Sequence, residues 1–132
     1  MPNFSNIVNI LPFVWVFVGG GLGSVTRYSL SRALPTMIGG FPLATLAANV
    51  VACITVGLLA GGLLRSSVPE AARWWGITGF CGGLSTFSTF SNETLLLLQS
   101  GRYMLAIIYG VISFAACIGS VAMGYTLLGI LR

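Results

Sequence analysis

The chain has 132 residues, of which 56% are hydrophobic and only 6% are charged, and its net charge is +4. A soluble domain carries about 25% charged residues, so this chain is too apolar to cover a water-facing surface and is expected to be an integral membrane protein with one membrane domain, residues 1–132. The absence of histidine excludes His-based catalysis and His metal sites, and six scattered arginines without a basic run argue against nucleic acid as a partner.

Intervals with little or no charge mark four expected transmembrane helices, at about 7–31, 41–64, 73–99 and 103–130. Each is long enough to cross the hydrocarbon core, which takes about 20 residues. The fold is expected to be all-α, because backbone groups in lipid must be satisfied within the segment and a barrel would show short alternating strands. No basic region precedes the first segment, which is therefore not expected to be a cleaved signal.

The first helix contains the stretch GGGLGSVTRY, Gly19–Tyr28. Its glycines allow close approach of another helix. Arg27 lies towards the interface, and two interpretations of it remain open. It can snorkel to the membrane surface, or it can serve a vestibule or hold the second loop of a partner chain.

The second helix contains Asn49, with Thr45 one turn earlier. Asn in the middle of a membrane is costly and usually pairs with another group. One interpretation is a hydrogen bond between helices. The alternative is an amide NH₂ that donates to an anion.

The third helix contains GFCGGLSTFSTFSNE, Gly79–Glu93. Its glycines each weaken a helix by about 1 kcal/mol relative to Ala, and its Ser and Thr side chains compete for backbone hydrogen bonds. Together they predict a break near residues 82–86. Carbonyls freed by a break can coordinate a hard cation such as Na⁺. A glycine-rich packing face is the alternative, but the density of hydroxyl groups favours a functional break.

Phe87 and Phe90 follow this break at a spacing of three, so they share a helix face. An isolated pair of this kind usually faces lipid or core, but here Ser88 and Thr89 lie between the rings. A Phe ring has a positive edge, and hydroxyl groups can donate to an ion as it sheds water. The pattern predicts contact with a small anion. Glu93, the only carboxylate in a span, either lies at a water-filled mouth or caps a neighbouring helix.

The fourth helix carries Tyr109 and Ser113 at a spacing of four, with Ser120 two turns further on. This polar stripe either packs against another helix or lines a path. The three cysteines, Cys53, Cys81 and Cys117, lie in apolar segments and have no metal-ligand spacing. They are interpreted as small hydrophobic side chains.

The arginines do not predict which side of the membrane each loop lies on, because four spans place three arginines on each side. Either another detail of the chain decides the orientation, or both orientations insert. A chain that inserts both ways can form an antiparallel two-fold dimer.

The third-helix stretch GFCGGLSTFSTFS resembles the signature of the Fluc (CrcB) fluoride channel family. The first-helix stretch GGGLGSVTRY and the second-helix stretch ATLAANVVAC are similar to two further family motifs. The length, the four spans and the balanced arginines agree with the same family. The resemblance covers essentially the whole chain, and its third-helix motif is the most specific part.

The resemblance implies an antiparallel, dual-topology homodimer in the cell membrane, with two fluoride pores and a central structural Na⁺ at the dimer interface. It implies passive fluoride efflux that gives fluoride resistance, and no enzymatic activity. The implied pore residues are Phe87, Phe90, Asn49, Ser88, Thr89, Tyr109, Ser113 and Glu93. Arg27 is implied at a vestibule, and the backbone carbonyls of Gly82 and Ser85 are implied as Na⁺ ligands, two from each subunit.

Four positions depart from the family pattern. Ala44 and Ala52 stand where Gly is usual, which changes close packing. Ser85 stands where Thr is common, which does not matter to a backbone ligand. Cys117 replaces a small hydroxyl one turn after Ser113, which puts the continuity of the polar track in question.

Two rival functions belong to other classes. A small dual-topology multidrug antiporter also uses four helices, but it needs a mid-membrane carboxylate, and the first three spans have none before Glu93. A non-transporting subunit that packs against a partner would explain the glycines but not the clustered hydroxyl groups. No nucleophile–base pair or metal set suggests an enzyme.

Overall fold

The structure, a computed structural model, describes residues 10–34, 39–65 and 67–130. This part of the chain is all-helical and contains no β-strand, which confirms the expected fold class at that level. The elements in chain order are α1 (Leu11–Ala33), α2 (Leu43–Leu64), η1 (Arg73–Cys81), α3 (Gly82–Leu84), α4 (Phe87–Gln99) and α5 (Tyr103–Ile130).

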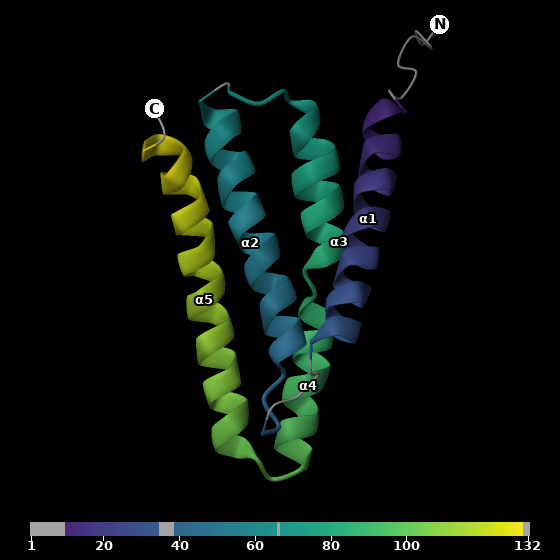
Figure 1. Cartoon of the computed structure of the whole chain (residues 1–132). Helices are drawn as coiled ribbons and strands as arrows, with labels where there is room; N and C mark the ends of the chain where they lie inside the picture. Colours follow the sequence, from purple (N-terminus) through teal and green to yellow (C-terminus); the bar gives the residue numbers. More distant parts are fainter. Residues whose placement is uncertain (1–9, 35–38, 66, 131–132) are drawn as a thin grey trace, which may run out of the picture.

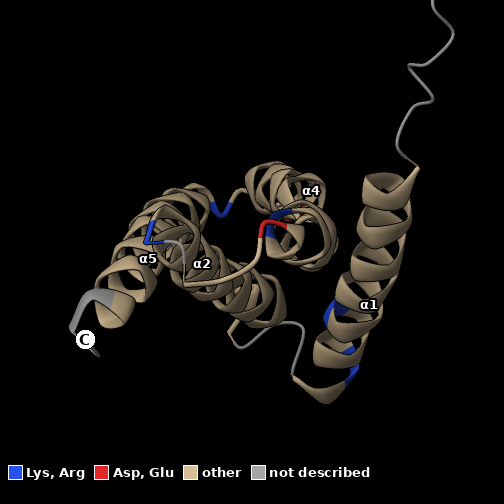
Figure 2. Cartoon of the chain, turned by 90° about the horizontal axis from the view of Figure 1, so that it is seen from above, with Lys and Arg blue, Asp and Glu red and all other residues tan. Residues whose placement is uncertain are grey.

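The elements form four rods that run along one long axis (Figure 1). The third rod consists of two parts, with η1 and α3 in one half and α4 in the other. α2 packs mainly against α5, and α1 packs mainly against η1 and α3. Seen along the axis, α1 stands across from the pair formed by α2 and α5, with the third rod near both (Figure 2).

Prolines lie at the starts of the first two helices. Pro12 occupies the first turn of α1, and Pro42 is the residue just before α2, both positions where the missing amide costs nothing. α1 ends at Ala33, two residues after the expected end, and its expected start at residue 7 lies outside the described residues. α2 starts two residues later than expected, and α5 has the expected bounds.

The third rod is interrupted at two residues, within the expected 82–86 interval. Ser85 (φ −71°, ψ 153°) and Thr86 (φ −149°, ψ 107°) are both extended, so the predicted break is confirmed. The sequence did not indicate a second feature of the rod: η1 is a π-helix. Hydrophobic patterning does not distinguish the wider π turn from an α turn, and π segments often occur at functional sites.

The turn between α4 and α5 has the geometry of a Schellman motif. Gly101 has φ 74°, the Arg102 amide donates to the Leu97 carbonyl at 2.9 Å, and the Gly101 amide donates to the Leu98 carbonyl at 3.0 Å. A glycine in this conformation ends a helix without strain. The turn therefore brings the end of α4 directly against the start of α5.

Glycines allow α1 to lie against the third rod with backbone in contact. A β-carbon at Gly19 would meet the Trp75 carbonyl, and one at Gly23 would meet the Phe80 carbonyl and the Leu84 amide nitrogen. The close approach holds α1 against the half of the rod that precedes the break. It explains why small residues, rather than large apolar ones, form this contact.

Replacing Gly23 by valine is expected to destabilise this contact. The added carbons have no space, and overpacking of this kind costs about 1–3 kcal/mol. We expect the melting temperature of the purified protein to fall by about 5 °C. Gly21→Ala is the matched control, because a β-carbon at Gly21 has nothing within 4 Å; equal melting temperatures for both variants would contradict the close-packing role.

Within the described residues, two helices are long and apolar enough to cross a membrane. They are Leu43–Leu64, with a mean hydropathy of 2.1, and Tyr103–Leu128, with a mean hydropathy of 2.2. The two halves of the third rod are each too short to be recognised as a span by length, because the break divides them. This division follows directly from the glycine and hydroxyl content of the segment.

Candidate functional site

The side chain of Asn49 on α2 holds the break in the third rod. The Thr86 amide donates to Asn49 Oδ1 at 2.8 Å, and the Ser85 amide keeps its helical bond to the Cys81 carbonyl at 2.9 Å. In a continuous helix the Thr86 amide would donate to the Gly82 carbonyl, four residues earlier. Asn49 therefore replaces that carbonyl as the acceptor, and its own NH₂ group remains available as a donor.

The Thr86 side chain caps the second half of the rod. Its hydroxyl oxygen accepts from the Thr89 amide at 3.1 Å, the N-cap arrangement that satisfies a free helix amide. The same hydroxyl donates to Thr89 Oγ1 at 2.9 Å and lies 3.2 Å from Ser88 Oγ. Three hydroxyl groups therefore cluster at the start of α4.

Glu93 joins three helices through its carboxylate. Thr45 Oγ1 on α2 donates to Glu93 Oε1 at 2.8 Å, and the Tyr109 hydroxyl on α5 donates to Glu93 Oε2 at 2.7 Å. A half-buried carboxylate needs such donors to offset its desolvation. Both bonds come from side-chain hydroxyl groups, so Glu93 links neighbouring helices without capping either of them.

Four aromatic rings form a continuous row from the start of α2 to the break. Phe41 meets Tyr109 edge-on, with ring centroids 5.4 Å apart and an interplanar angle of 82°. Tyr109 lies 5.0 Å from Phe90, and Phe90 lies 5.7 Å from Phe87. Tyr109 is fully buried, whereas Phe87 is 80% exposed on this single chain. The row leads from the interior of the chain to its surface.

A cavity of about 380 Å³, here called the phenylalanine cavity, opens beside this row. Ser113 lines it, and the Ser113 hydroxyl is buried without a hydrogen-bond partner. Such a group is costly unless a ligand or water satisfies it. The complete lining is Asn49, Cys53, Ser85, Phe87, Phe90, Gly110, Ser113, Phe114 and Cys117.

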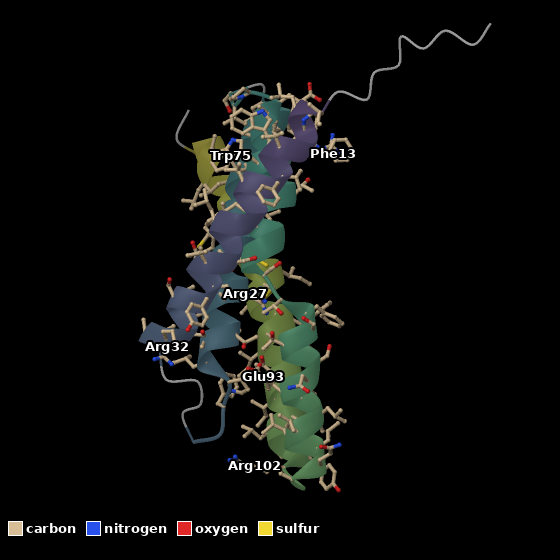
Figure 3. The ribbon with its side chains drawn as sticks, turned by 90° about the vertical axis from the view of Figure 1, so that its right-hand side faces the viewer. Phe13, Arg27, Arg32, Trp75, Glu93 and Arg102 are labelled. Carbon is tan, nitrogen blue, oxygen red and sulfur yellow. The ribbon has the colours of Figure 1, made fainter. Side chains whose placement is uncertain are left out.

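A second cavity of about 280 Å³, here called the α1–α4 cavity, is lined mostly by residues with polar or charged side chains. Arg27 on α1 and Glu93 on α4 both line it, with Glu93 further along the long axis in the direction of Arg102 (Figure 3). Arg27 therefore lies at a cavity within the bundle. The complete lining is Ser24, Arg27, Tyr28, Ser31, Ala44, Thr45, Ala48, Thr86, Thr89 and Glu93.

The two cavities divide the residues selected from the sequence. Thr89, Glu93 and Arg27 line the α1–α4 cavity, whereas Asn49, Ser85, Phe87, Phe90 and Ser113 line the phenylalanine cavity. Tyr109 lies behind Phe90 and lines neither, Ser88 is exposed, and Gly82 is exposed with open space around it. The site residues are therefore gathered around the break, on two sides of it.

Sequence reasoning missed three contributors to this site. Thr86 was counted only as one of several hydroxyl residues, although it is the cap of α4. Thr45 was noted only for its spacing from Asn49 on the same helix, and that spacing does not indicate its bond to Glu93 on another helix. Phe41 was expected as the first residue of the second helix, but α2 begins at Leu43, and the contact of Phe41 with Tyr109 spans 68 residues of sequence, so no local signal marked it.

Replacing Thr45 by valine tests the Glu93 contacts. Valine has nearly the same shape but no donor, so Glu93 Oε1 loses a hydrogen bond in a half-buried place, at a cost of about 1–3 kcal/mol. We expect a clear fall in melting temperature. Thr55→Val on the same helix is the control, because the Thr55 hydroxyl donates only to the Val51 carbonyl of its own helix, at 2.8 Å; equal effects of the two changes would argue against a special role for Glu93.

Comparison with known proteins gives a consistent assignment. Residues 14–125 match the family described as CrcB-like protein, Camphor Resistance (CrcB). A protein of Pyrococcus abyssi (strain GE5 / Orsay), named fluoride-specific ion channel FluC, is 42% identical over 123 residues, which cover 91% of this chain and 98% of that protein. A protein of Ignicoccus hospitalis with the same name is 41% identical over 111 residues, covering 84% of this chain and 89% of that protein. Because these matches cover most of its length, the chain belongs to the CrcB family.

Proposed function

We propose that this membrane protein is a fluoride-selective channel, not an enzyme, and that it gives passive fluoride efflux across the cell membrane and so fluoride resistance. Two similar proteins are named as fluoride-specific ion channels. The observation that carries the proposal is the unpaired Ser113 hydroxyl in the same cavity as the Phe87 and Phe90 rings and the Asn49 amide. These groups supply weak positive charge to an anion without a fixed cation that would trap it.

The chemistry of these groups suits fluoride more than larger halides. Fluoride is small and strongly hydrated, so the loss of water is its main obstacle. The Asn49 NH₂ group, the hydroxyl groups and the ring edges would each replace part of that hydration. Arg27 would attract the anion to the α1–α4 cavity, and Ser88, Thr89, Tyr109 and Glu93 would form a polar track beside the rings.

Na⁺ is proposed as a structural ion bound at the break. The Thr86 amide, which would be the helical donor to the Gly82 carbonyl, donates to Asn49 instead, and Gly82 lies at an exposed position. Carbonyl oxygens are the hard ligands that such a cation takes. Within the described residues no three His, Cys, Asp or Glu side chains lie together to hold a metal, so backbone carbonyls such as those of Gly82 and Ser85 are the available ligands.

The functional unit is proposed to be an antiparallel homodimer of dual topology, with all four rods spanning the membrane and two pores per dimer. Phe87 is 80% exposed on the single chain, and a second copy would cover it and close the open side of the phenylalanine cavity. The exposed Gly82 would then meet its counterpart in the partner. Two carbonyls from each chain would complete the Na⁺ site.

The proposal is tested with purified protein in liposomes loaded with potassium fluoride or potassium chloride. We expect fluoride to leave passively while chloride stays inside. Equal leakage of both ions would defeat the assignment. Proton-driven uptake of a cationic drug would favour the antiporter, and no transport at all would favour the packing subunit. Tags on the termini should report both orientations in cells; a single orientation would exclude an antiparallel dimer of this chain alone.

A further inference from the structure

The loop before α2 is tied to the start of α5 by one arginine. Arg102 Nη2 donates to the Gly39 carbonyl at 2.6 Å. The next residue, Gly40, packs against the same guanidinium group, which a β-carbon at this position would displace. Gly39 (φ 60°) and Gly40 (φ 87°) both adopt left-handed conformations that other residues rarely take. The loop conformation therefore depends on both glycines and on Arg102.

Phe41 directly follows these two glycines and lies against Tyr109. The Phe41 ring meets the Tyr109 ring edge-on from one side, and the Phe90 ring lies on Tyr109 at a centroid distance of 5.0 Å. Tyr109 is fully buried between them. Because two rings limit its rotation, the Tyr109 hydroxyl is held 2.7 Å from Glu93 Oε2.

We infer that Phe41 and Arg102 are positioning residues of the proposed fluoride path. Arg102 sets the loop, the loop places Phe41, and Phe41 holds the Tyr109 hydroxyl on Glu93. Neither Phe41 nor Arg102 lines the α1–α4 cavity or the phenylalanine cavity, so they act through Tyr109 rather than on the ion. The inference rests on the proposed channel function for its transport consequence, but not for the contacts themselves.

Arg65 offers a matched comparison at the opposite end of α2 and α5. Its Nη1 atom donates to the Gly61 and Tyr125 carbonyls at 3.3 Å each, and its guanidinium group lies 5.3 Å from the centre of the Tyr125 ring. It is thus also an arginine that joins these two segments through backbone carbonyls. It has no contact with the row of rings that contains Tyr109.

The first measurement is the NMR signal of the tyrosine ring carbon that bears the hydroxyl group, in protein labelled at that carbon. The chain has four tyrosines, and Tyr109→Phe identifies the Tyr109 signal by its loss. We expect Phe41→Ala and Arg102→Gln to shift or broaden the Tyr109 signal. Arg65→Gln should shift the Tyr125 signal and leave Tyr109 unchanged. An unaltered Tyr109 signal in both Phe41→Ala and Arg102→Gln would overturn the inference, whether or not the protein carries fluoride.

The second measurement is a double-mutant cycle in the fluoride efflux assay. We expect Phe41→Ala to slow efflux about fivefold, as the loss of an edge-on aromatic contact predicts. In the Tyr109→Phe background the same change should have no further effect, because the hydroxyl group that Phe41 positions is already gone. Phe41→Trp should restore efflux more than Phe41→Leu, which keeps apolar volume without a ring.

The outcomes separate this inference from the proposed function. Equal slowing by Phe41→Ala in both backgrounds would show that Phe41 only supports the fold, and the inference would fail. A wild-type protein that carries no fluoride would defeat the proposed function, and the NMR comparison would then decide the positioning role alone. Melting temperatures of all variants show whether each is folded.

Discussion

Phe90→Ile is expected to slow fluoride efflux from liposomes by about a hundredfold, equivalent to about 2.8 kcal/mol of barrier. Isoleucine fills most of the same volume, and such a swap in a packed place usually costs less than about 1.5 kcal/mol of stability. It has no ring edge, however, and so offers an anion no positive rim. Phe90 lies between Phe87 and Tyr109 in the row of rings, so its loss interrupts the row at its centre.

Phe87→Ile should act in the same direction, because the Phe87 ring lines the same cavity. The matched control is Phe17→Ile on α1, since Phe17 is 83% exposed and Phe87 is 80% exposed on the single chain. The control should leave efflux unchanged. The assay requires that the yield of folded protein and its melting temperature remain near wild type. Unchanged efflux in both Phe87→Ile and Phe90→Ile would remove the ring-edge mechanism.

Asn49→Asp is expected to slow efflux at least as much as Phe90→Ile does, by about a hundredfold, while the break in the third rod persists. An aspartate oxygen can still accept the hydrogen bond that the Thr86 amide donates to Asn49 Oδ1 at 2.8 Å. The NH₂ donor is lost, however, and a carboxylate repels a fluoride ion. The change thus separates the observed role of Asn49, as acceptor for the Thr86 amide, from its proposed role as a donor to an anion.

Asn49→Leu is the comparison for this experiment. It removes the acceptor as well as the donor, so the Thr86 amide is left unpaired at a cost of about 1–3 kcal/mol. We expect a lower melting temperature for Asn49→Leu than for Asn49→Asp, with little efflux in either. Wild-type efflux in Asn49→Asp would show that the amide group gives no hydrogen bond to the ion.

The candidate site could be predicted in part because some of its signals are local. The glycines and hydroxyl groups between Gly79 and Glu93 indicated the break, since helix propensity depends on each residue and its neighbours. The spacing of Tyr109 and Ser113 indicated a shared face, and both are buried on α5. The contacts of Glu93 with Thr45 and Tyr109 could not be read from spacing, because they join three helices.

The Phe41 contact was missed for the same reason. Phe41 lies in a short segment between helices, where no periodicity marks a buried face. Its place depends on two left-handed glycines and on an arginine 61 positions later. The π-helical turns of η1 were also missed, because they have the same apolar composition as an α-helix.

The amino-acid sequence by itself determined that this is a helical membrane chain with a weak point in its third span, because composition and helix propensity are properties of neighbouring residues. Only the tertiary structure decided that Asn49 accepts the hydrogen bond of the Thr86 amide at the break. It also decided that Glu93 accepts hydrogen bonds from side chains on both α2 and α5. Such partners are set by how closely the rods approach, which depends on backbone contacts such as that of Gly23 with Phe80. No local pattern carries that information.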